Sequence, residues 1–362
     1  MYKIMTPGPT QVRENVRMAR SLVCTNPDLD PEFYDYYRDT CSLINELLET
    51  KNPAYILDGE GILGLEAACA SLTEPGDRVL VVDNGVYGHG FANFVKIYGG
   101  EAVFYEAPYT RAIDVEAFRE YLKEHHDFKY AAMVHCDTPS GVLNPVEEMG
   151  RALHEYGILS VVDSVSTMFG EPLHVDEGQL DIVCGGSQKA LSAPPGLSFV
   201  TVSPAAMKAM EDRRTPIASF YANILVFRDY YKDQWFPYTM PISDICGLRT
   251  ALENVKADPK RFERHRKLGE LCRKYILDLG LSLYLEDGFS NTVTVVRVPE
   301  GIGAADILES MKREHGIMIA GSFDVLAGQA IRIGHMGENA NEKDVRETLD
   351  ALADVLKKLN QD

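Results

Sequence analysis

The stretch YILDGEGILGLEAA, residues 55–68, decides the fold class. An apolar run with strand character leads into three glycines spaced Gly59-x-Gly61-x-x-Gly64, and a helix-like run follows them. A strand that passes through a glycine turn directly into a helix opens a β–α–β unit. The turn ends at a helix N-terminus, which is suited to receive an anion. Glu60 places a carboxylate in this turn, where it would repel one.

The same alternation continues from about residue 54 to residue 212. Strand-like runs occur at 54–57, 78–83, 102–105, 130–135, 159–163, 181–184 and 197–202. Most of them are β-branched and apolar on both faces, which is typical of strands buried in a parallel sheet. Helical patterns lie between them, for example at 91–98, 115–123 and 145–156. This order predicts an α/β layered fold with right-handed crossovers.

The pattern changes after residue 212. An aromatic and proline-rich loop at 233–241 precedes expected helices at 243–256 and 260–279. The rest of the chain mixes expected strands and helices, with strands at 292–298, 317–320 and 331–333 and helices at 305–314 and 341–358. We expect a large, mainly parallel-sheet domain over residues 1–255 and a smaller α+β C-terminal domain over residues 256–362.

Composition excludes several classes of partner. The net charge of −18 over 362 residues disfavours nucleic acid, which needs a basic face, and anionic membrane surfaces. No apolar run reaches transmembrane length. The seven cysteines contain no C-x-x-C pair and the histidines show no zinc-binding spacing, so we expect a cytoplasmic chain without a metal site.

Two groups of residues compete for the chemistry. The first is the glycine turn together with Asp83, which lies 83 − 64 = 19 residues after Gly64. This spacing is typical of a dinucleotide site and would indicate an NAD-dependent dehydrogenase. The same glycines also suit a plain tight turn. Glu60 counts against a dinucleotide, because a like charge at about 4 Å costs roughly 4 kcal/mol at an effective dielectric of 20.

The second group lies at the ends of two later strands. Run 159–162 ends at Asp163, and run 181–184 leads into Gly185-Gly186-Ser187-Gln188-Lys189. Ligands of α/β sheets bind at the carboxyl ends of the strands. An acid and a lysine placed there could bracket a pyridine ring. The acid would keep the ring nitrogen protonated, and the lysine would form a Schiff base and move the proton.

The motifs GSQKALSAPPG (186–196) and RIGHMG (332–337) resemble those of the class V aminotransferases of fold type I. The resemblance covers essentially the whole chain and is strongest to the branch of serine–pyruvate, alanine–glyoxylate and pyridoxamine–pyruvate aminotransferases. It implies transfer of an amino group to a small 2-keto acid, pyruvate or glyoxylate, with pyridoxal 5'-phosphate as cofactor. The implied partners are a small amine and a 2-keto acid, and the implied assembly is a homodimer or a dimer of dimers.

The resemblance also assigns roles to individual residues. Lys189 corresponds to the Schiff-base lysine and Asp163 to the partner of the ring nitrogen. The implied cofactor-binding set comprises the phosphate-cup residues Glu60, Gly61 and Ile62, the ring-stacking Tyr87, Thr138 at the ring oxygen, Val165 under the ring, Gln188 beside the phosphate, and Thr239 donated by a neighbouring subunit. The implied substrate-side set comprises the carboxylate clamp Arg332 together with Gly8 and Pro9.

Glu60 singles out one branch within this family. The loop GEGILGLEAACASL (59–72) is similar to that of pyridoxamine–pyruvate aminotransferases, which take unphosphorylated pyridoxamine or pyridoxal as a substrate. A carboxylate repels a phosphate that carries about −1.5 to −2 charges, yet it can accept a hydrogen bond from a hydroxymethyl group. We therefore expect Glu60 to select the free vitamer over its phosphate ester.

Three positions depart from this pattern. Phe323 stands nine residues before Arg332, where the pyridoxamine branch has a second arginine, and Gln188 follows the phosphate-binding branch. Phe236, in turn, replaces a tyrosine that contacts phosphate in the alanine–glyoxylate branch. A conventional phosphate-dependent aminotransferase of the alanine–glyoxylate or serine–pyruvate type therefore stays open as the alternative.

Overall fold

A seven-stranded sheet forms the centre of the computed structural model, which describes residues 2–22 and 24–361. The strand order is β2-β10-β9-β8-β5-β3-β4. Its strands are β2 (Ala54–Asp58), β3 (Arg78–Asp83), β4 (Glu101–Glu106), β5 (Tyr130–Val134), β8 (Leu159–Asp163), β9 (Ile182–Gly186) and β10 (Leu197–Val202). Only β10 runs antiparallel to its neighbours in this sheet. The predicted mainly parallel sheet is confirmed.

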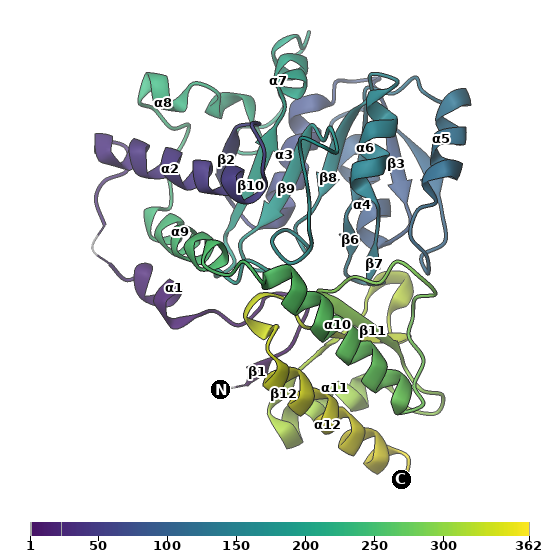
Figure 1. Ribbon diagram of the computed structural model, residues 1–362. Coiled ribbons are helices and arrows are strands. Elements are labelled where there is room, and N and C mark those ends of the chain that lie inside the picture. Colours follow the sequence, from purple (N-terminus) through teal and green to yellow (C-terminus); the bar gives the residue numbers. More distant parts are fainter. Residues whose placement is uncertain (1, 23, 362) are drawn as a thin grey trace.

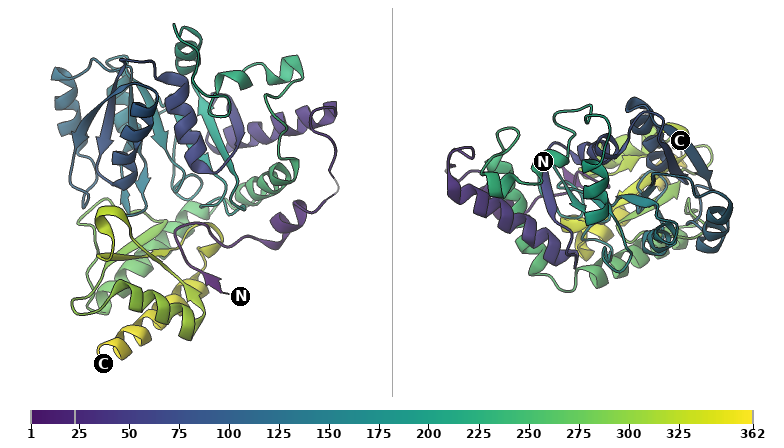
Figure 2. Two further views of the ribbon diagram at one scale, coloured as in Figure 1. Left: turned by 180° about the vertical axis from the view of Figure 1, so that it is seen from behind. Right: turned by 90° about the horizontal axis from the view of Figure 1, so that it is seen from above.

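Helices cover both faces of this sheet (Figures 1 and 2). The helices that follow the strands of the sheet are α3 (Gly61–Leu72), α4 (Val86–Ile97), α5 (Val115–Glu124), α6 (Val146–His154) and α7 (Pro204–Glu211). Four further helices pack at the β2 end of the sheet: α1 (Glu14–Ala19), α2 (Pro31–Leu47), α8 (Tyr230–Asp233) and α9 (Ile242–Lys256). Gly88 explains how α4 lies so close to β3, because a Cβ there would come 2.5 Å from the carbonyl oxygen of Val82.

The C-terminal part is smaller and mixed, as expected. An antiparallel sheet of β11 (Val293–Arg297), β14 (Ala330–Gly334) and β13 (Ala320–Gly321) packs with α10 (Arg261–Asp278), α11 (Ala304–His315) and α12 (Glu342–Leu359). The N-terminal strand β1 (Lys3–Ile4) pairs in parallel with β12 (Ile317–Met318), so the start of the chain lies against this part (Figure 1). The proposed boundary at 255/256 stays a prediction. One apolar cluster lies wholly before it, a second joins Met5 to residues of the C-terminal part, and a third contains residues from both sides.

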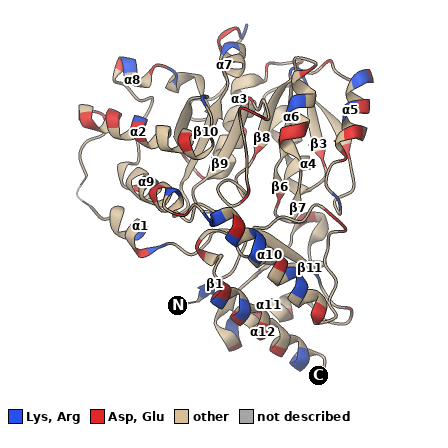
Figure 3. Cartoon of the chain, viewed as in Figure 1, with Lys and Arg blue, Asp and Glu red and all other residues tan. Residues whose placement is uncertain are grey.

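Two short strands and three short 3-10 helices complete the fold. Strands β6 (Cys136–Asp137) and β7 (Val142–Leu143) form a two-stranded ribbon after β5, and the 3-10 helices are η1 (Leu225–Phe227), η2 (Asp324–Leu326) and η3 (Gly337–Asn339). Charged residues gather mainly on the outer helices, while the central strands carry few of them (Figure 3). Within the described ranges, no helix combines the length and the apolar character needed to cross a bilayer.

Candidate active site

A cavity of about 140 Å³ opens at the carboxyl ends of the parallel strands. Its walls are formed by Glu60, Ile62, Leu65, Tyr87, Cys136, Thr138, Asp163, Val165, Ser166 and Lys189. The parallel strands explain this convergence, because their carboxyl ends meet at one edge of the sheet. Seven of the residues assigned from the sequence therefore line one cavity. Leu65, Cys136 and Ser166 were not expected, and nothing in their local sequence marks them.

Lys189 is held by the N-terminal segment. Its Nζ donates a hydrogen bond to the carbonyl oxygen of Pro7 at 2.9 Å. Gly8 has a φ of +93°, and a Cβ there would overlap the Lys189 side chain. Burial lowers the pKa of Lys189, Arg332 lowers it further, and Glu60 opposes both effects. A lysine with a lowered pKa offers more of the neutral amine at neutral pH, which is the form that attacks a carbonyl carbon.

Asp163 lies at the end of β8 and is only 7% exposed. Its Oδ1 accepts a hydrogen bond from the Val165 amide at 2.9 Å. Burial raises the pKa of Asp163 to about 7, although the Val165 hydrogen bond and the charge of Lys189 act in the opposite direction. A protonated ring nitrogen placed beside this carboxylate would stabilise its charged form. Asp163 therefore has the burial and charge expected of a residue that pairs with a pyridine ring nitrogen.

The orientation of Tyr87 depends on a buried acid that the sequence analysis missed. The Tyr87 amide donates to Asp137 Oδ1 at 2.8 Å, and the hydroxyl of Ser140 donates to Oδ2 at 2.8 Å. Gly85 allows this approach, since a Cβ there would overlap the Asp137 carboxylate. Burial raises the pKa of Tyr87 to about 12, and Asp163 adds to the effect. The run Asp137-Thr138-Pro139-Ser140-Gly141, whose composition is typical of a turn, was the available signal.

Glu60 caps its own helix and also contacts Gln188. Its Oε2 accepts the Ile62 amide hydrogen bond at 3.0 Å at the start of α3, and its Oε1 accepts from Gln188 Nε2. Gln188 is 3% exposed, and its Oε1 is buried without a partner in the described part of the chain. The Ile62 amide, expected to face a phosphate, is thus bonded to a carboxylate. Glu60 stays exposed to solvent while it makes these two contacts.

Val165 and Thr138 add uncharged side chains to the cavity lining. Val165 lies against two glycines, because a Cβ at Gly61 or at Gly186 would come within 2.8 and 2.9 Å of its Cγ1. Thr138 is buried and lines the cavity. Tyr87, Val165 and Thr138 therefore line the same cavity. These positions agree with the expected contacts, whose roles stay predictions.

Arg332 lies beside the cavity on β14 and is nearly buried. Its Nε and Nη2 both donate to the carbonyl oxygen of Gly321, at 2.9 and 2.7 Å. Its Cζ lies 5.3 Å from the centre of the Phe323 ring. Burial lowers the pKa of Arg332, and the Tyr87 and Asp137 charges oppose this. The guanidinium is thus fixed at the small-domain side of the site.

Six of the expected site residues do not line the cavity: Gly8, Pro9, Gly61, Gln188, Thr239 and Arg332. Thr239 is exposed, and its hydroxyl donates to Asp28 Oδ2 at 2.8 Å. The carbonyl oxygen of Pro9 accepts from Thr6 Oγ1 at 2.8 Å. Phe236 is buried and stacks on Tyr34 at 4.9 Å between ring centres. The predicted contact of Thr239 with a neighbouring subunit's cofactor stays a prediction.

The carboxylate of Asp83, the candidate ribose-binding acid, is paired with two other side chains. Its Oδ2 lies 2.7 Å from Nδ1 of His89, and its Oδ1 accepts from the hydroxyl of Tyr109 at 2.7 Å. A ribose-binding acid needs a free carboxylate edge. The structure therefore gives the dinucleotide interpretation no support at this residue.

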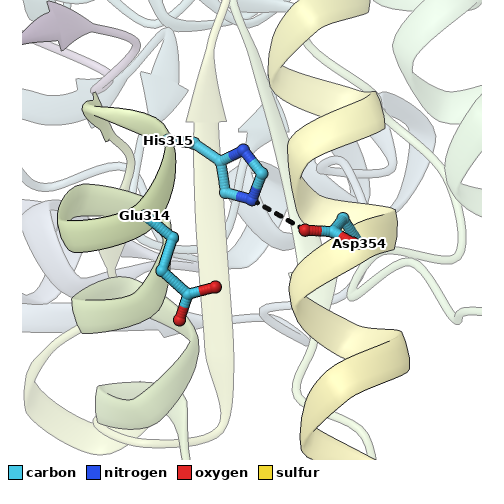
Figure 4. A group of neighbouring side chains, drawn as sticks. All are labelled: Glu314, His315 and Asp354. Carbon is cyan, nitrogen blue, oxygen red and sulfur yellow. Dashed lines mark hydrogen bonds and ion pairs between the residues drawn. The ribbon is translucent and has the colours of Figure 1, made fainter.

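One cluster of side chains has metal-like geometry within the described residues. It lies between α11 and α12 (Figure 4), and none of its members lines the cavity. Nε2 of His315 lies 3.1 Å from Oδ2 of Asp354. Lys358 Nζ lies 2.7 Å from Asp354 and 3.0 Å from Glu314. The ammonium group of Lys358 already balances the charges of Glu314 and Asp354, so the cluster is a surface ion-pair network.

Comparisons with known proteins agree with this geometry. The family model described as aminotransferase class-V matches residues 18–344. The chain is 33% identical to a pyridoxamine–pyruvate transaminase from Mesorhizobium japonicum, over 93% of this chain and 86% of that protein. The structure of ureidoglycine–glyoxylate aminotransferase from Bacillus subtilis is 32% identical with a TM-score of 0.96, covering 99% of this chain and 94% of that one. An alanine–glyoxylate aminotransferase from Nostoc sp. is 30% identical with a TM-score of 0.94, covering 98% and 95%.

Proposed function

The chain belongs to the class V aminotransferase family, and we propose that it transfers an amino group between unphosphorylated pyridoxamine and a small 2-keto acid. Membership makes it an aminotransferase of fold type I and rules out the dehydrogenase alternative. The family depends on pyridoxal 5'-phosphate. What distinguishes this chain is the form of the vitamer that its cavity accepts.

The position of Glu60 carries the proposal. Helix N-termini bind phosphate through free amides and a favourable dipole. Here the Glu60 carboxylate bonds the Ile62 amide and pairs with Gln188 Nε2, so a negative charge already lies where a phosphate would bind. At about 4 Å a like charge costs roughly 4 kcal/mol at an effective dielectric of 20, and solvent reduces this at an exposed side chain. A tenfold to hundredfold preference for the alcohol is the expected result.

The residues that line the cavity would suit the ring of pyridoxamine or pyridoxal. When bound, the vitamer's ring would draw electrons from the carbon that carries the amino group. Asp163 would hold the ring nitrogen in its protonated form, and Tyr87 and Val165 would fix the ring plane. Lys189 Nζ would supply the amine that meets the aldehyde and would carry the proton at the reacting carbon.

Arg332 would bind the carboxylate of the 2-keto acid. Two of its nitrogens are bonded to Gly321, which fixes the plane of the guanidinium before substrate arrives. A charge-assisted contact with a preset plane is stronger and more specific than one made by a mobile lysine. Gly8 and Pro9 would close the substrate side, because their segment packs directly on Lys189.

Vitamer preference tests this proposal. Binding of pyridoxal and of pyridoxal 5'-phosphate would be measured by absorbance for the wild type, for Glu60→Ser and for Glu60→Gln. Both substitutions should shift preference toward the phosphate ester by about tenfold to hundredfold. Glu66→Gln removes the same charge from the same helix outside the cavity and should leave the preference unchanged. A wild type that purifies with tightly bound phosphate ester contradicts the proposal.

A phosphate-dependent enzyme of the alanine–glyoxylate type is the second candidate. Gln188 favours it, because this position follows the phosphate-binding branch of the family and lies beside Glu60. The same binding comparison separates the two candidates.

We also propose a homodimer in the cytoplasm. Phe220, Tyr221 and Trp235 are exposed near the Thr239 loop, and the Tyr238 hydroxyl is buried without a partner among the residues described. A second copy on this face would cover these rings and bring Thr239 to its cavity. All seven cysteines are free thiols, which agrees with a reducing compartment. Sedimentation velocity tests the dimer, and a monomer at micromolar concentration contradicts it.

A further inference from the structure

We infer that Glu171 is a positioning residue that fixes the strand carrying Arg332 relative to Lys189. The inference rests on the proposed function only in that a 2-keto acid binds at Arg332. Glu171 lies between β8 and β9 and is only 4% exposed. Its Oε1 accepts from the hydroxyl of Ser290 at 3.2 Å and from the Asn291 amide, and its Oε2 accepts from Asn291 Nδ2 at 3.1 Å. One buried carboxylate thus receives three hydrogen bonds from the segment that leads into β11.

Asn291 connects Glu171 to the strand that carries Arg332. The carbonyl oxygen of Asn291 lies 2.9 Å from Nδ1 of His335, and Nε2 of His335 lies 2.8 Å from Thr294 Oγ1. Burial lowers the pKa of His335 to about 3, so the ring is neutral, with Nδ1 donating to Asn291 and Nε2 accepting from Thr294. His335 directly follows β14, three residues after Arg332. A shift of Asn291 would therefore move the end of β14.

The loop of Glu171 also contacts the turn that carries Lys189. A Cβ at Gly170 would come 3.0 Å from Cβ of Ala190 and 2.7 Å from Cγ2 of Thr292. The loop thus packs between the neighbour of Lys189 and the residue that precedes β11. The distance between Lys189 and Arg332 sets where a keto acid meets the amine, and a misplacement of about 1 Å can cost about a hundredfold in rate.

The carboxylate of Glu171 holds this junction only when it is ionised. Its described partners are all donors, so the O–H of a protonated Glu171 would face one of them. Burial raises the pKa of Glu171, while the hydrogen bonds from Asn291 and Ser290 and the charge of Arg273 oppose this. Arg273, on α10, also donates to the carbonyl oxygen of Ser290 at 2.8 Å and to Asn291 Oδ1 at 3.2 Å.

Two other titratable groups face this junction from the described elements around it. They are His335, whose ring is neutral, and the thiol of Cys136 on β6, whose pKa burial raises to about 12. Neither changes charge between about pH 5 and pH 8. A fall in pH should therefore loosen the junction through Glu171 itself.

Kinetics and hydrogen exchange of Glu171→Gln test this inference. The glutamine still accepts from Ser290 and from the Asn291 amide, but its NH₂ group would face the NH₂ group of Asn291. We expect kcat/KM for pyruvate, with pyridoxamine as donor, to fall about fivefold to thirtyfold, because a buried donor loses its acceptor. Pyridoxal binding should stay within about twofold. Amide exchange, measured by mass spectrometry, should become about tenfold faster in peptides covering 290–297 and 330–336.

The pH profile separates the charge of Glu171 from its shape. The ratio of kcat/KM between wild type and Glu171→Gln should shrink as pH falls from about 8 to about 5, because the wild type then loses the ionised carboxylate. Asp163 titrates in both proteins, so its effect cancels in this ratio. A ratio that is constant with pH overturns the inference.

A double variant tests the bond itself. In Glu171→Gln/Asn291→Asp the donor and the acceptor change places, and a carboxylate stays beside Arg273. We expect kcat/KM to return to within about threefold of wild type. If Glu171→Gln alone does not fold, recovery of folding and turnover in the double variant supports the inference. A double variant no better than the single one overturns it.

Asp181→Asn is the matched control. Asp181 is also a buried acid, and it accepts from the Ser160 amide and from the hydroxyl of Ser203, both in the part that forms the large sheet. This variant should leave kcat/KM within about twofold and exchange at 290–297 unchanged, with folding checked by circular dichroism. An equal loss of kcat/KM in Asp181→Asn, or faster exchange with unchanged kcat/KM in Glu171→Gln, would make the role merely structural and overturns the inference.

The vitamer measurements keep this test separate from the proposed function. If the enzyme requires the phosphate ester, the proposed function fails, and the same ratios are then measured with that ester and an amino acid donor. If Glu171→Gln matches wild type in kcat/KM and in exchange while Glu60→Ser shifts vitamer preference, the inference about Glu171 alone fails.

Discussion

The two ends of the cavity are both built to meet an anion, but only one of them offers an uncompensated positive charge. At the α3 end, the helix N-terminus is bonded to the carboxylate of Glu60. At the β14 end, Arg332 bonds a neutral carbonyl oxygen, that of Gly321, and keeps its charge. The fold therefore sets where anions can bind, and a single side chain at each end of the cavity decides whether that end accepts an anion.

Lys189 lies between the two ends, and its removal should have the largest effect. Lys189→Ala should fold and lose turnover by about 10²–10⁴-fold or more, because both the amine and the proton carrier are gone. Borohydride reduction of wild type with pyridoxal, followed by mass spectrometry, should attach the vitamer to the peptide that contains Lys189. Attachment to another lysine would refute the assignment.

Arg332→Ala tests the cationic end. Truncating one partner of a buried charge pair costs roughly 2–5 kcal/mol, so the KM for the keto acid should rise by about 30-fold or more. Arg332→Lys should recover only part of this loss, because an ammonium cannot reproduce the fork. Vitamer preference should not change in either variant. If the KM for the keto acid is unaltered in Arg332→Ala, another residue binds the carboxylate, and Arg332 is not the cation that makes the β14 end accept an anion.

The buried carboxyl of Asp163 should make the stability of the folded protein depend on pH. Its pKa is about 7 in the folded protein, above the ordinary value of 3.8, so the folded state binds an extra proton between these pH values. Stability of the vitamer-free protein should therefore fall by roughly 2–4 kcal/mol as pH rises from about 4 to about 7. Asp163→Asn should remove this slope and also weaken transamination. Thermal unfolding across this pH range measures it, and an identical slope in wild type and variant would contradict the assignment.

The smallest expected effect concerns the support of Glu60. Gln188→Leu removes the Nε2 hydrogen bond to Glu60 while keeping a side chain of similar size in a buried position. Glu60 would keep its bond to Ile62, so preference for pyridoxal should drop only a few-fold, which matches the roughly 1 kcal/mol of one hydrogen bond. Binding titrations with both vitamers measure the change. A loss as large as that in Glu60→Ser would show that Gln188, and not the charge, sets the selection.

Much of the fold followed from local sequence. Each of the seven expected strands between residues 54 and 202 is present in the sheet, since short β-branched runs between turns are a local signal. The expected helix at 260–279 appears as Arg261–Asp278, and that at 341–358 as Glu342–Leu359. The antiparallel direction of β10 was not predicted, because strand direction depends on which neighbours pair and not on the residues of one run.

The sequence by itself determined which residues could carry the chemistry. Asp163 and Lys189 follow buried strands, and that position alone sends them to the binding edge of the sheet. Only the tertiary structure decided how Glu60 is used and what surrounds Lys189 and Arg332. The Glu60–Gln188 bond joins residues 128 positions apart, and the Lys189–Pro7 bond joins residues 182 apart. Contacts of that separation arise from the packing of whole elements, so no local pattern of residues encodes them.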